Sequence, residues 1–204
     1  MYLSLPAWEE RLGTELNDET TAYLKDFGAA TASNGAVGLY HIEHLTPEAK
    51  ELGAGLVAPG AKVYVIDDAE LQRVQDSYPV IWKNPDAKPK LCFIGCPHMS
   101  LQQLKDWTVA VEKGLKKAGH DKVQIPTVFT TAPAVKEVFE QTEYAQRLKA
   151  TGVILSYICP LMYMNNPLSG KKPVITNSNK LRTYTTARYF TDAEILNYIT
   201  KGEK

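Results

Sequence analysis

The sequence has few of the features that define several large classes of protein. Its 204 residues include only three cysteines, Cys92, Cys96 and Cys159. A small and odd number of cysteines argues against a disulfide framework and favours free thiols or metal ligands in a reducing compartment. No apolar run approaches the roughly 20 residues that a membrane-spanning helix needs. We therefore expect a cytoplasmic chain with no membrane partner.

An excess of charge of either sign is also absent. Lys and Arg number 23 and are balanced by 23 Asp and Glu, so the formal net charge is zero. This balance gives no reason to expect nucleic acid as a partner. The first residues have no basic region ahead of an apolar core, so we expect no secretory signal. The apolar fraction of 44% and the charged fraction of 23% are ordinary for a globular domain.

Short apolar runs alternate with helical patterns along most of the chain. Six runs are predicted as strands: residues 35–42, 61–66, 91–94, 126–131, 153–158 and 173–176. Helices are predicted for residues 18–27 and 67–74, and from starts at Thr46, Ser100, Pro133, Thr142 and Thr191. Continuous apolar runs are typical of strands that are buried on both faces. We predict an α/β fold of three layers, α/β/α, with a mostly parallel, doubly wound sheet. Residues 1–26 are expected to be an appendage, and residues 27–204 the α/β domain.

Residues 90–104 (KLCFIGCPHMSLQQL) combine a strand, a reactive cluster and a helix start. Gly95 is expected to let the chain turn out of the sheet, with Cys96 and His98 in the turn and Ser100 beginning a capping box. Open α/β sheets place their chemistry between the carboxyl end of a strand and the amino end of a helix. The helix dipole there favours a thiolate, so the pattern predicts a functional role for Cys96.

Two further predicted turns carry chemically active groups. Cys159 follows the fifth predicted strand, and Asn177, Ser178 and Lys180 follow the sixth. Because parallel strands end at one edge of a sheet, we expect these groups to gather with Cys96 in one pocket. The long spacing of Cys96 and Cys159 differs from the close pairs of a zinc ribbon. It suits an iron–sulfur cluster or a mononuclear metal held by separate loops.

Each of these residues also has an ordinary structural interpretation. A cysteine near a strand is often a small buried apolar residue, and Cys92, inside its strand, fits this best. Asn177 or Ser178 could cap the helix that follows, and Lys180 could be a solvated surface lysine. His98 could bond a neighbouring carbonyl. The patterns alone leave both interpretations open.

Taken together, four segments resemble the catalytic large subunit of the aconitase X family, which includes phosphomevalonate dehydratase and hydroxyproline dehydratases. They are residues 27–42 with 46–49, residues 94–98 (IGCPH), residues 159–160 (CP), and residues 176–178 (TNS) with Lys180. Their order also matches, and the resemblance extends from about residue 25 to the end. It implies an aconitase-like α/β/α fold and dehydration of a hydroxy acid through an iron or iron–sulfur centre.

The resemblance also implies roles for individual residues. Cys96 and Cys159 look like two ligands of the iron centre, and Ser178 looks like the base that removes a proton next to a carboxylate. Lys180 and Asn177 look like contacts to a small anionic hydroxy-acid substrate. The family's remaining ligand belongs to a part that this chain does not match. The resemblance therefore implies a complementary N-terminal half, a small swivelling subunit, or both.

Three functions follow from these patterns. The first is part of an aconitase-type hydro-lyase that works with a complementary polypeptide. The second is a non-catalytic binding or assembly module that kept the fold and lost the metal site. The third is a thiol enzyme that uses Cys96 with His98. These residues are two positions apart in a turn, which is a poor arrangement for a nucleophile and its base.

Overall fold

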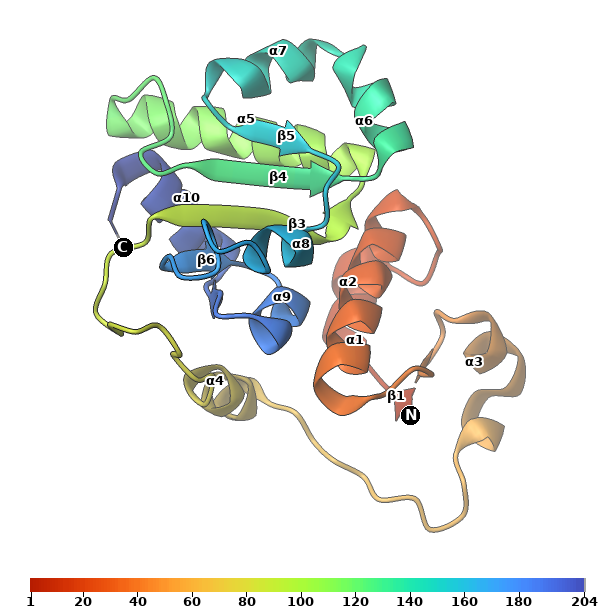
Figure 1. Cartoon of the computed structure of the whole chain (residues 1–204). Coiled ribbons are helices and arrows are strands. Elements are labelled where there is room, and N and C mark those ends of the chain that lie inside the picture. Colours follow the sequence, from red (N-terminus) through yellow and green to blue (C-terminus); the bar gives the residue numbers. More distant parts are fainter. Residues whose placement is uncertain (204) are drawn as a thin grey trace.

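A five-stranded parallel sheet forms the centre of the protein, whose computed structural model describes residues 1–203 (Figure 1). The strands are β3 (Leu91–Met99), β4 (Thr127–Thr131), β5 (Ile154–Ser156), β6 (Val174–Thr176) and β7 (Arg188–Tyr189). Their order in the sheet is β5-β4-β3-β6-β7, so the chain winds outward from β3 in both directions. The switch point of this doubly wound sheet lies between β3 and β6.

Helices cover both faces of the sheet (Figure 1). One face packs against α5 (Leu101–Ala118) and α10 (Asp192–Lys201), with α6 (Pro133–Glu140) and α7 (Glu143–Ala150) beside them. The other face packs against α8 (Pro160–Met164) and α9 (Asn179–Tyr184). The predicted three-layer α/β/α fold is confirmed.

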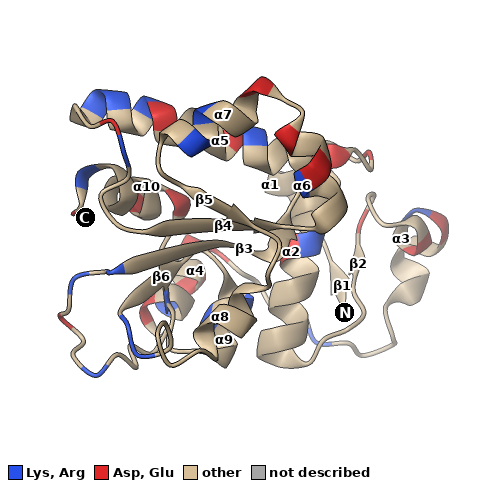
Figure 2. Ribbon diagram, turned by 45° about the horizontal axis from the view of Figure 1, so that its top comes forward, with Lys and Arg blue, Asp and Glu red and all other residues tan. Residues whose placement is uncertain are grey.

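The inner strands are uncharged because each lies between two layers, and the edge strand β5, where Ile154 is 56% exposed, is uncharged as well. β3, β4, β5 and β6 contain no Asp, Glu, Lys or Arg, and Figure 2 shows the charged residues on the outer helices and loops. Burial of this kind on both faces is what a continuous apolar run predicts. No helix within residues 1–203 has the length and apolar character needed to cross a membrane.

Side-chain caps fix where the helices around the sheet begin. The Ser100 hydroxyl accepts a hydrogen bond from the Gln103 N–H at 3.1 Å, and Gln103 Oε1 accepts one from the Ser100 N–H at 2.9 Å. This capping box starts α5, which ends at Gly119 with φ +73°. A second box at Thr191 starts α10. These predicted helix boundaries are confirmed.

Residues 6–35 pack at the carboxyl edge of the sheet, and the rest of the N-terminal third extends away from that edge (Figure 1). Its helices are α1 (Pro6–Leu12), α2 (Asp18–Gly35), α3 (Pro47–Leu52), the short 3-10 helix η1 (Gly53–Leu56) and α4 (Asp68–Asp76). β1 (Tyr2–Leu3) and β2 (His41–Ile42) form a separate two-stranded parallel sheet. α2 is attached to α9 through Asn34, whose Oδ1 accepts hydrogen bonds from Arg182 Nη2 at 2.6 Å and Thr183 Oγ1 at 2.7 Å.

Two predicted strands are wrong. α2 continues to Gly35 and ends at Ala36 with φ 53°, so of residues 35–42 only His41 and Ile42 form a strand, and they pair with β1. Residues 61–66 form no strand. A strand needs a neighbour for its hydrogen-bonding groups, and no described strand lies beside this segment. β7 has only two residues and was not predicted.

β3 does not end at Gly95 as expected but continues to Met99 with a bulge. Between the pairs Ile94–Phe129 and Met99–Thr131, β3 advances five residues while β4 advances two. Gly95 has φ +109°, and a Cβ built there would lie 2.2 Å from the Thr130 carbonyl oxygen. The bulge reverses the alternation of side chains: Cys92 faces α5 and α10, whereas Cys96 faces α8 and α9.

Candidate active site

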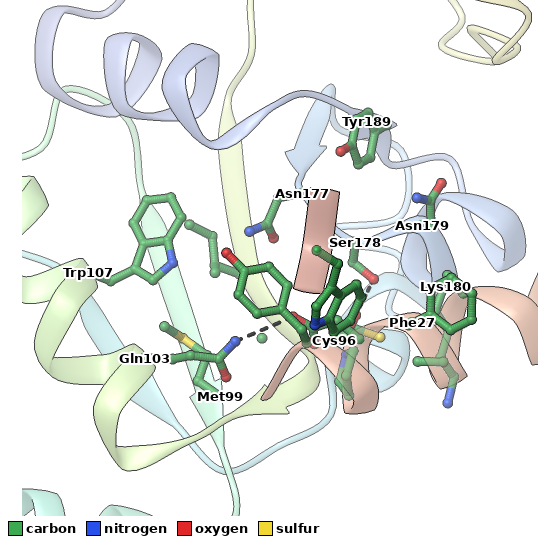
Figure 3. A pocket seen from close by; sticks show the side chains of 18 residues that line it. Phe27, Cys96, Met99, Gln103, Trp107, Asn177, Ser178, Asn179, Lys180 and Tyr189 are labelled. Atoms are coloured by element: carbon green, nitrogen blue, oxygen red, sulfur yellow. Dashed lines mark hydrogen bonds between the residues drawn. The ribbon is translucent and has the colours of Figure 1, made fainter. Parts of the chain in front are cut away.

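A cavity of about 340 Å³ opens at the carboxyl ends of β3 and β6, at the switch point of the sheet (Figure 3). This volume is in the range of small-molecule sites. The wall from β3 and α5 includes Cys96, Met99, Gln103 and Trp107. The wall beyond β6 includes Asn177, Ser178, Asn179, Lys180 and Tyr189. α1 and α2 contribute a third wall of Trp8, Tyr23, Asp26 and Phe27.

Cys96 is buried at the base of this cavity, with 7% of its surface exposed. Burial raises the pKa of its thiol above the ordinary value. The negative charge of Asp26 acts in the same direction, while the nearby Ser178 hydroxyl and the positive charge of Lys180 oppose it. The expected thiolate is therefore not favoured here, because desolvation outweighs the neighbouring dipole and charge.

The Ser178 side chain makes two hydrogen bonds at the edge of the cavity. Its hydroxyl donates to the Cys96 carbonyl oxygen and accepts a hydrogen bond from the Leu181 N–H at 2.9 Å (Figure 3). The second contact makes Ser178 the N-cap of α9, as its ordinary interpretation predicts. The same residue lines the cavity, with 5% of its surface exposed. The hydroxyl that caps α9 therefore also lines the cavity.

Asn177 and Lys180 flank Ser178 on the same wall. Asn177 Nδ2 donates a hydrogen bond to Asp192 Oδ1 at 2.8 Å. The side-chain carbonyl oxygen of Asn177 takes no part in that bond. Lys180 lies in the first turn of α9 and lines the cavity. The structure therefore brings Cys96, Asn177, Ser178 and Lys180 together.

The other two cysteines lie elsewhere. Cys159 is the residue before α8 and is half-buried. It is outside the cavity lining. Cys92 is completely buried on the opposite face of the sheet, where burial strongly raises its pKa. Cys92 is therefore a core residue, as its ordinary interpretation predicts.

The residues present do not complete a ligand set for iron. Within residues 1–203 no three His, Cys, Asp or Glu side chains are grouped closely enough to hold a metal ion. Cys96 and Cys159 supply two thiols near one face, and Cys92 faces the other. A cluster held by thiolates needs more ligands than this chain brings together.

A polar network that the sequence did not predict joins α2 to β3 and α5. Lys25 Nζ donates to the His98 carbonyl oxygen and to Gln103 Oε1, the latter at 2.9 Å. Gln103 Nε2 in turn donates to Asp26 Oδ2 at 3.3 Å. Burial lowers the pKa of Lys25 and raises the pKa of Asp26. The only sequence signal was the capping pattern that includes Gln103, which does not predict contacts with α2.

Replacing Asp26 by Asn should stabilise the chain at pH 7. Desolvation raises the pKa of Asp26, and the Lys25 charge and the Gln103 hydrogen bond only partly offset it. The charged form is therefore disfavoured in the folded state, so Asp26→Asn should increase the free energy of unfolding by about 1 kcal/mol or less. The gain should disappear as the pH falls through the raised folded pKa toward the unfolded value, where Asp26 is neutral in both states. Urea unfolding at pH 7 and below pH 4 measures this, with the exposed Asp86→Asn as control. An equal gain at both pH values would contradict the prediction.

The three thiols should react with iodoacetamide at very different rates. Cys159 is half-buried, whereas Cys96 is buried and has a raised pKa. At pH 7 Cys159 should therefore be labelled at least about 10-fold faster than Cys96, and Cys92 should stay unlabelled until the chain unfolds. Peptide mass spectrometry over a pH series measures each rate. Rapid labelling of Cys96 at pH 7 would contradict the burial described above.

The thiol-enzyme hypothesis finds no support in this geometry. Within the described chain no hydrogen bond joins Cys96 to His98, and the buried His98 Nε2 has no partner. Burial lowers the pKa of His98, and the Lys25 charge adds to this effect. A neutral imidazole does not stabilise a thiolate, and burial raises the pKa of the Cys96 thiol.

The sheet order and the cavity at its switch point define an α/β protein with a small-molecule site of the kind found in enzymes. Comparison with known proteins identifies the family. The model of the aconitase X third domain matches residues 89–197, and that of the aconitase X second domain matches residues 12–76. The chain belongs to the aconitase X family, as its motifs predicted.

Several relatives extend this similarity. The chain is 29% identical to the phosphomevalonate dehydratase large subunit of Thermococcus kodakarensis over 171 residues, which are 83% of this chain and 40% of that protein. It is 29% identical to the cis-3-hydroxy-L-proline dehydratase of Hypocrea jecorina over 172 residues, which are 79% of this chain and 26% of that protein. The crystal structure of Thermococcus kodakaraensis aconitase X in its holo-form matches all of this chain and 47% of that chain, with a TM-score of 0.68 and 25% identity. The chain thus spans less than half the length of these relatives.

Proposed function

We propose that this chain is part of a hydro-lyase that removes water from a small anionic hydroxy acid. The observation that carries the proposal is the cavity at the switch point, where Ser178 lies between Asn177 and Lys180 and contacts Cys96. Relatives over most of the chain are named as dehydratases, which supports a reaction of the same type.

The residues of the cavity can perform the proton transfer that a dehydration needs. Lys180 would attract the substrate carboxylate, and the side-chain carbonyl oxygen of Asn177, whose amide donates to Asp192, would accept from the substrate hydroxyl and orient it. The Ser178 hydroxyl would pass its proton to the hydroxyl on the neighbouring carbon, which departs as water, and the serine alkoxide would take the proton from the carbon next to the carboxylate. The two transfers leave Ser178 protonated again and the substrate with a carbon–carbon double bond. The Leu181 N–H and the Lys180 charge favour the ionised serine, and the Cys96 carbonyl holds its proton before reaction.

We further propose that Cys96 and Cys159 are two ligands of an iron or iron–sulfur centre that a complementary polypeptide completes. Two observations support the need for such a polypeptide. The ligand set within residues 1–203 is incomplete, and this chain covers less than half the length of each relative. The name of the Thermococcus relative describes a large subunit, so a further subunit is also proposed.

The test is anaerobic reconstitution with iron and sulfide of the chain purified together with its partner. The complex should gain iron and charge-transfer absorbance and dehydrate phosphomevalonate or cis-3-hydroxy-L-proline, the two substrates that the relatives' names provide. Cys96→Ala should lose both the absorbance and the activity. A folded complex that binds no iron would end the hydro-lyase proposal.

A non-catalytic assembly module is the second candidate. The absence of a third ligand near Cys96 and Cys159 among the described residues favours it. In that case the complex would form with its partner and remain free of iron, and Cys96→Ala would leave complex formation unchanged. Iron content of the purified complex therefore separates the two functions.

A further inference from the structure

Residues 61–66 (AKVYVI) are an apolar segment that no other part of residues 1–203 covers. Val63, Tyr64, Val65 and Ile66 are 90%, 70%, 77% and 59% exposed. Figure 1 shows the connection between η1 and α4 running at a distance from the sheet. Within residues 1–203 the N–H groups of residues 62–66 donate no hydrogen bond to the protein. Four successive large apolar side chains exposed to water mark an interaction site.

The pattern of this segment is that of an inner strand. In an extended chain Val63 and Val65 point to one face, and Tyr64 and Ile66 to the other. Both faces are therefore apolar, which is typical of a strand covered on both sides and not of an edge strand with one wet face. β-branched and aromatic residues also favour the extended conformation.

α4 continues the same interaction surface. It begins directly after the segment, with Asp67 Oδ1 accepting from the Glu70 N–H at 2.8 Å, and no residue of α4 is buried. Leu71 and Val74, three positions apart, form one apolar stripe and are 58% and 37% exposed. The Tyr64 hydroxyl donates to the Glu70 carboxylate and holds the segment beside the helix. Residues 61–76 are thus an extended apolar segment and a helix, with no strand of the described chain paired to the segment.

A sheet that would cover this segment lies outside residues 1–203. The matched crystal structure aligns with all of this chain over only 47% of its own chain, so more than half of that protein lies outside the matched part. A second copy of this chain would supply only one identical strand and a second α4. The two-stranded sheet formed in this way would have one face uncovered. A polypeptide with strands and two covering layers satisfies both faces.

We propose that residues 61–66 become an inner strand of a sheet in the complementary polypeptide of the aconitase X family, with Leu71 and Val74 of α4 packed over it. This inference rests on the proposed function for the identity of the partner. The strand would join the two polypeptides through main-chain hydrogen bonds, as in other cases of strand addition.

The experiment places a photo-reactive benzophenone residue at position 65 and, in a control chain, at position 138. Val138 is an exposed valine on α6, 53% exposed and distant in the sequence. After irradiation in the cells that produce the chain, mass spectrometry identifies the cross-linked protein. Position 65 should cross-link to a polypeptide that matches the part of aconitase X relatives outside this chain's matched region, and position 138 should not. Cross-links to a second copy, to an unrelated protein or to nothing would overturn the proposal.

Hydrogen exchange of the purified complex is the second measurement. The amides of residues 62–66 should exchange at least about 100-fold more slowly in the complex than in the chain alone. Val65→Lys should weaken the complex at least about 10-fold, and Val138→Lys should leave it within about 2-fold, since a buried charge is costly. Val65 is exposed in the isolated chain, so V65K should fold normally. Unprotected amides in a stable complex would contradict the proposal.

Water elimination is assayed in the same preparations. A complex that protects residues 62–66 but eliminates no water would contradict the proposed function and leave the strand in place. An active complex with unprotected amides would contradict the strand and leave the function in place.

Discussion

Gly95→Ala should lower the free energy of unfolding by at least about 4 kcal/mol, which is enough to unfold many domains. The added Cβ would lie 2.2 Å from the Thr130 carbonyl oxygen and 2.6 Å from its hydroxyl. Both atoms belong to β4 at the centre of the sheet, so the two strands would have to separate. The φ of +109° adds backbone strain for any residue with a Cβ. Urea denaturation followed by circular dichroism measures the loss.

Gly119→Ala is the matched control. Gly119 also has a positive φ, +73°, but a Cβ there would meet nothing within 4 Å. Its substitution should cost only the local backbone strain of about 1–2 kcal/mol. Equal losses in the two variants would show that the approach of Gly95 to Thr130 does not restrict the strand, and would contradict the structure of the bulge.

Ser178→Ala should lower the kcat of the reconstituted complex by about 10²- to 10⁴-fold, the usual contribution of a positioned base. The same substitution removes the N-cap of α9 and should cost about 0.5–2 kcal/mol of stability. Activity is therefore compared at a temperature where both proteins are folded, and the pH dependence of kcat is recorded for each.

Asn17→Ala separates the two effects of that substitution. The Asn17 side chain caps α2 by accepting hydrogen bonds from the Glu19 and Thr20 N–H groups, each at 3.0 Å, and it lies outside the cavity lining. Its loss should destabilise the chain by a similar amount while leaving kcat within about 2-fold. If Ser178→Ala changed kcat no more than Asn17→Ala, Ser178 would be a cap alone.

The central sheet could be predicted because its strands are short apolar runs flanked by helix caps. The runs that became β3, β4, β5 and β6 lie next to one another, so each found the neighbours that a strand requires. Residues 61–66 have an equally good pattern and formed no strand, since propensity does not supply a partner. The short β7 carries too few residues to show any period.

The candidate site was predicted in part. The ends of strands can be located from the sequence, whereas the way in which helices pack against them cannot. The turns after β3 and β6 do bring Cys96, Asn177, Ser178 and Lys180 onto one cavity. The bulge at Gly95, which turns Cys96 to the opposite face from Cys92, depends on the approach of Thr130 and leaves no pattern in the sequence. The wall from α1 and α2, including Trp8 and Asp26, depends on how those helices dock.

One measurement tests the proposed metal and catalytic roles of Cys96, Cys159 and Ser178. It compares the rate at which the reconstituted complex eliminates water from the hydroxy acids named above with the rates of the chain alone and of the Ser178→Ala complex. We predict turnover by the wild-type complex, none by the chain alone, and a loss of at least about 100-fold in the variant. An iron-loaded, folded complex that releases no dehydrated product, or a variant that retains the full rate, would contradict the account.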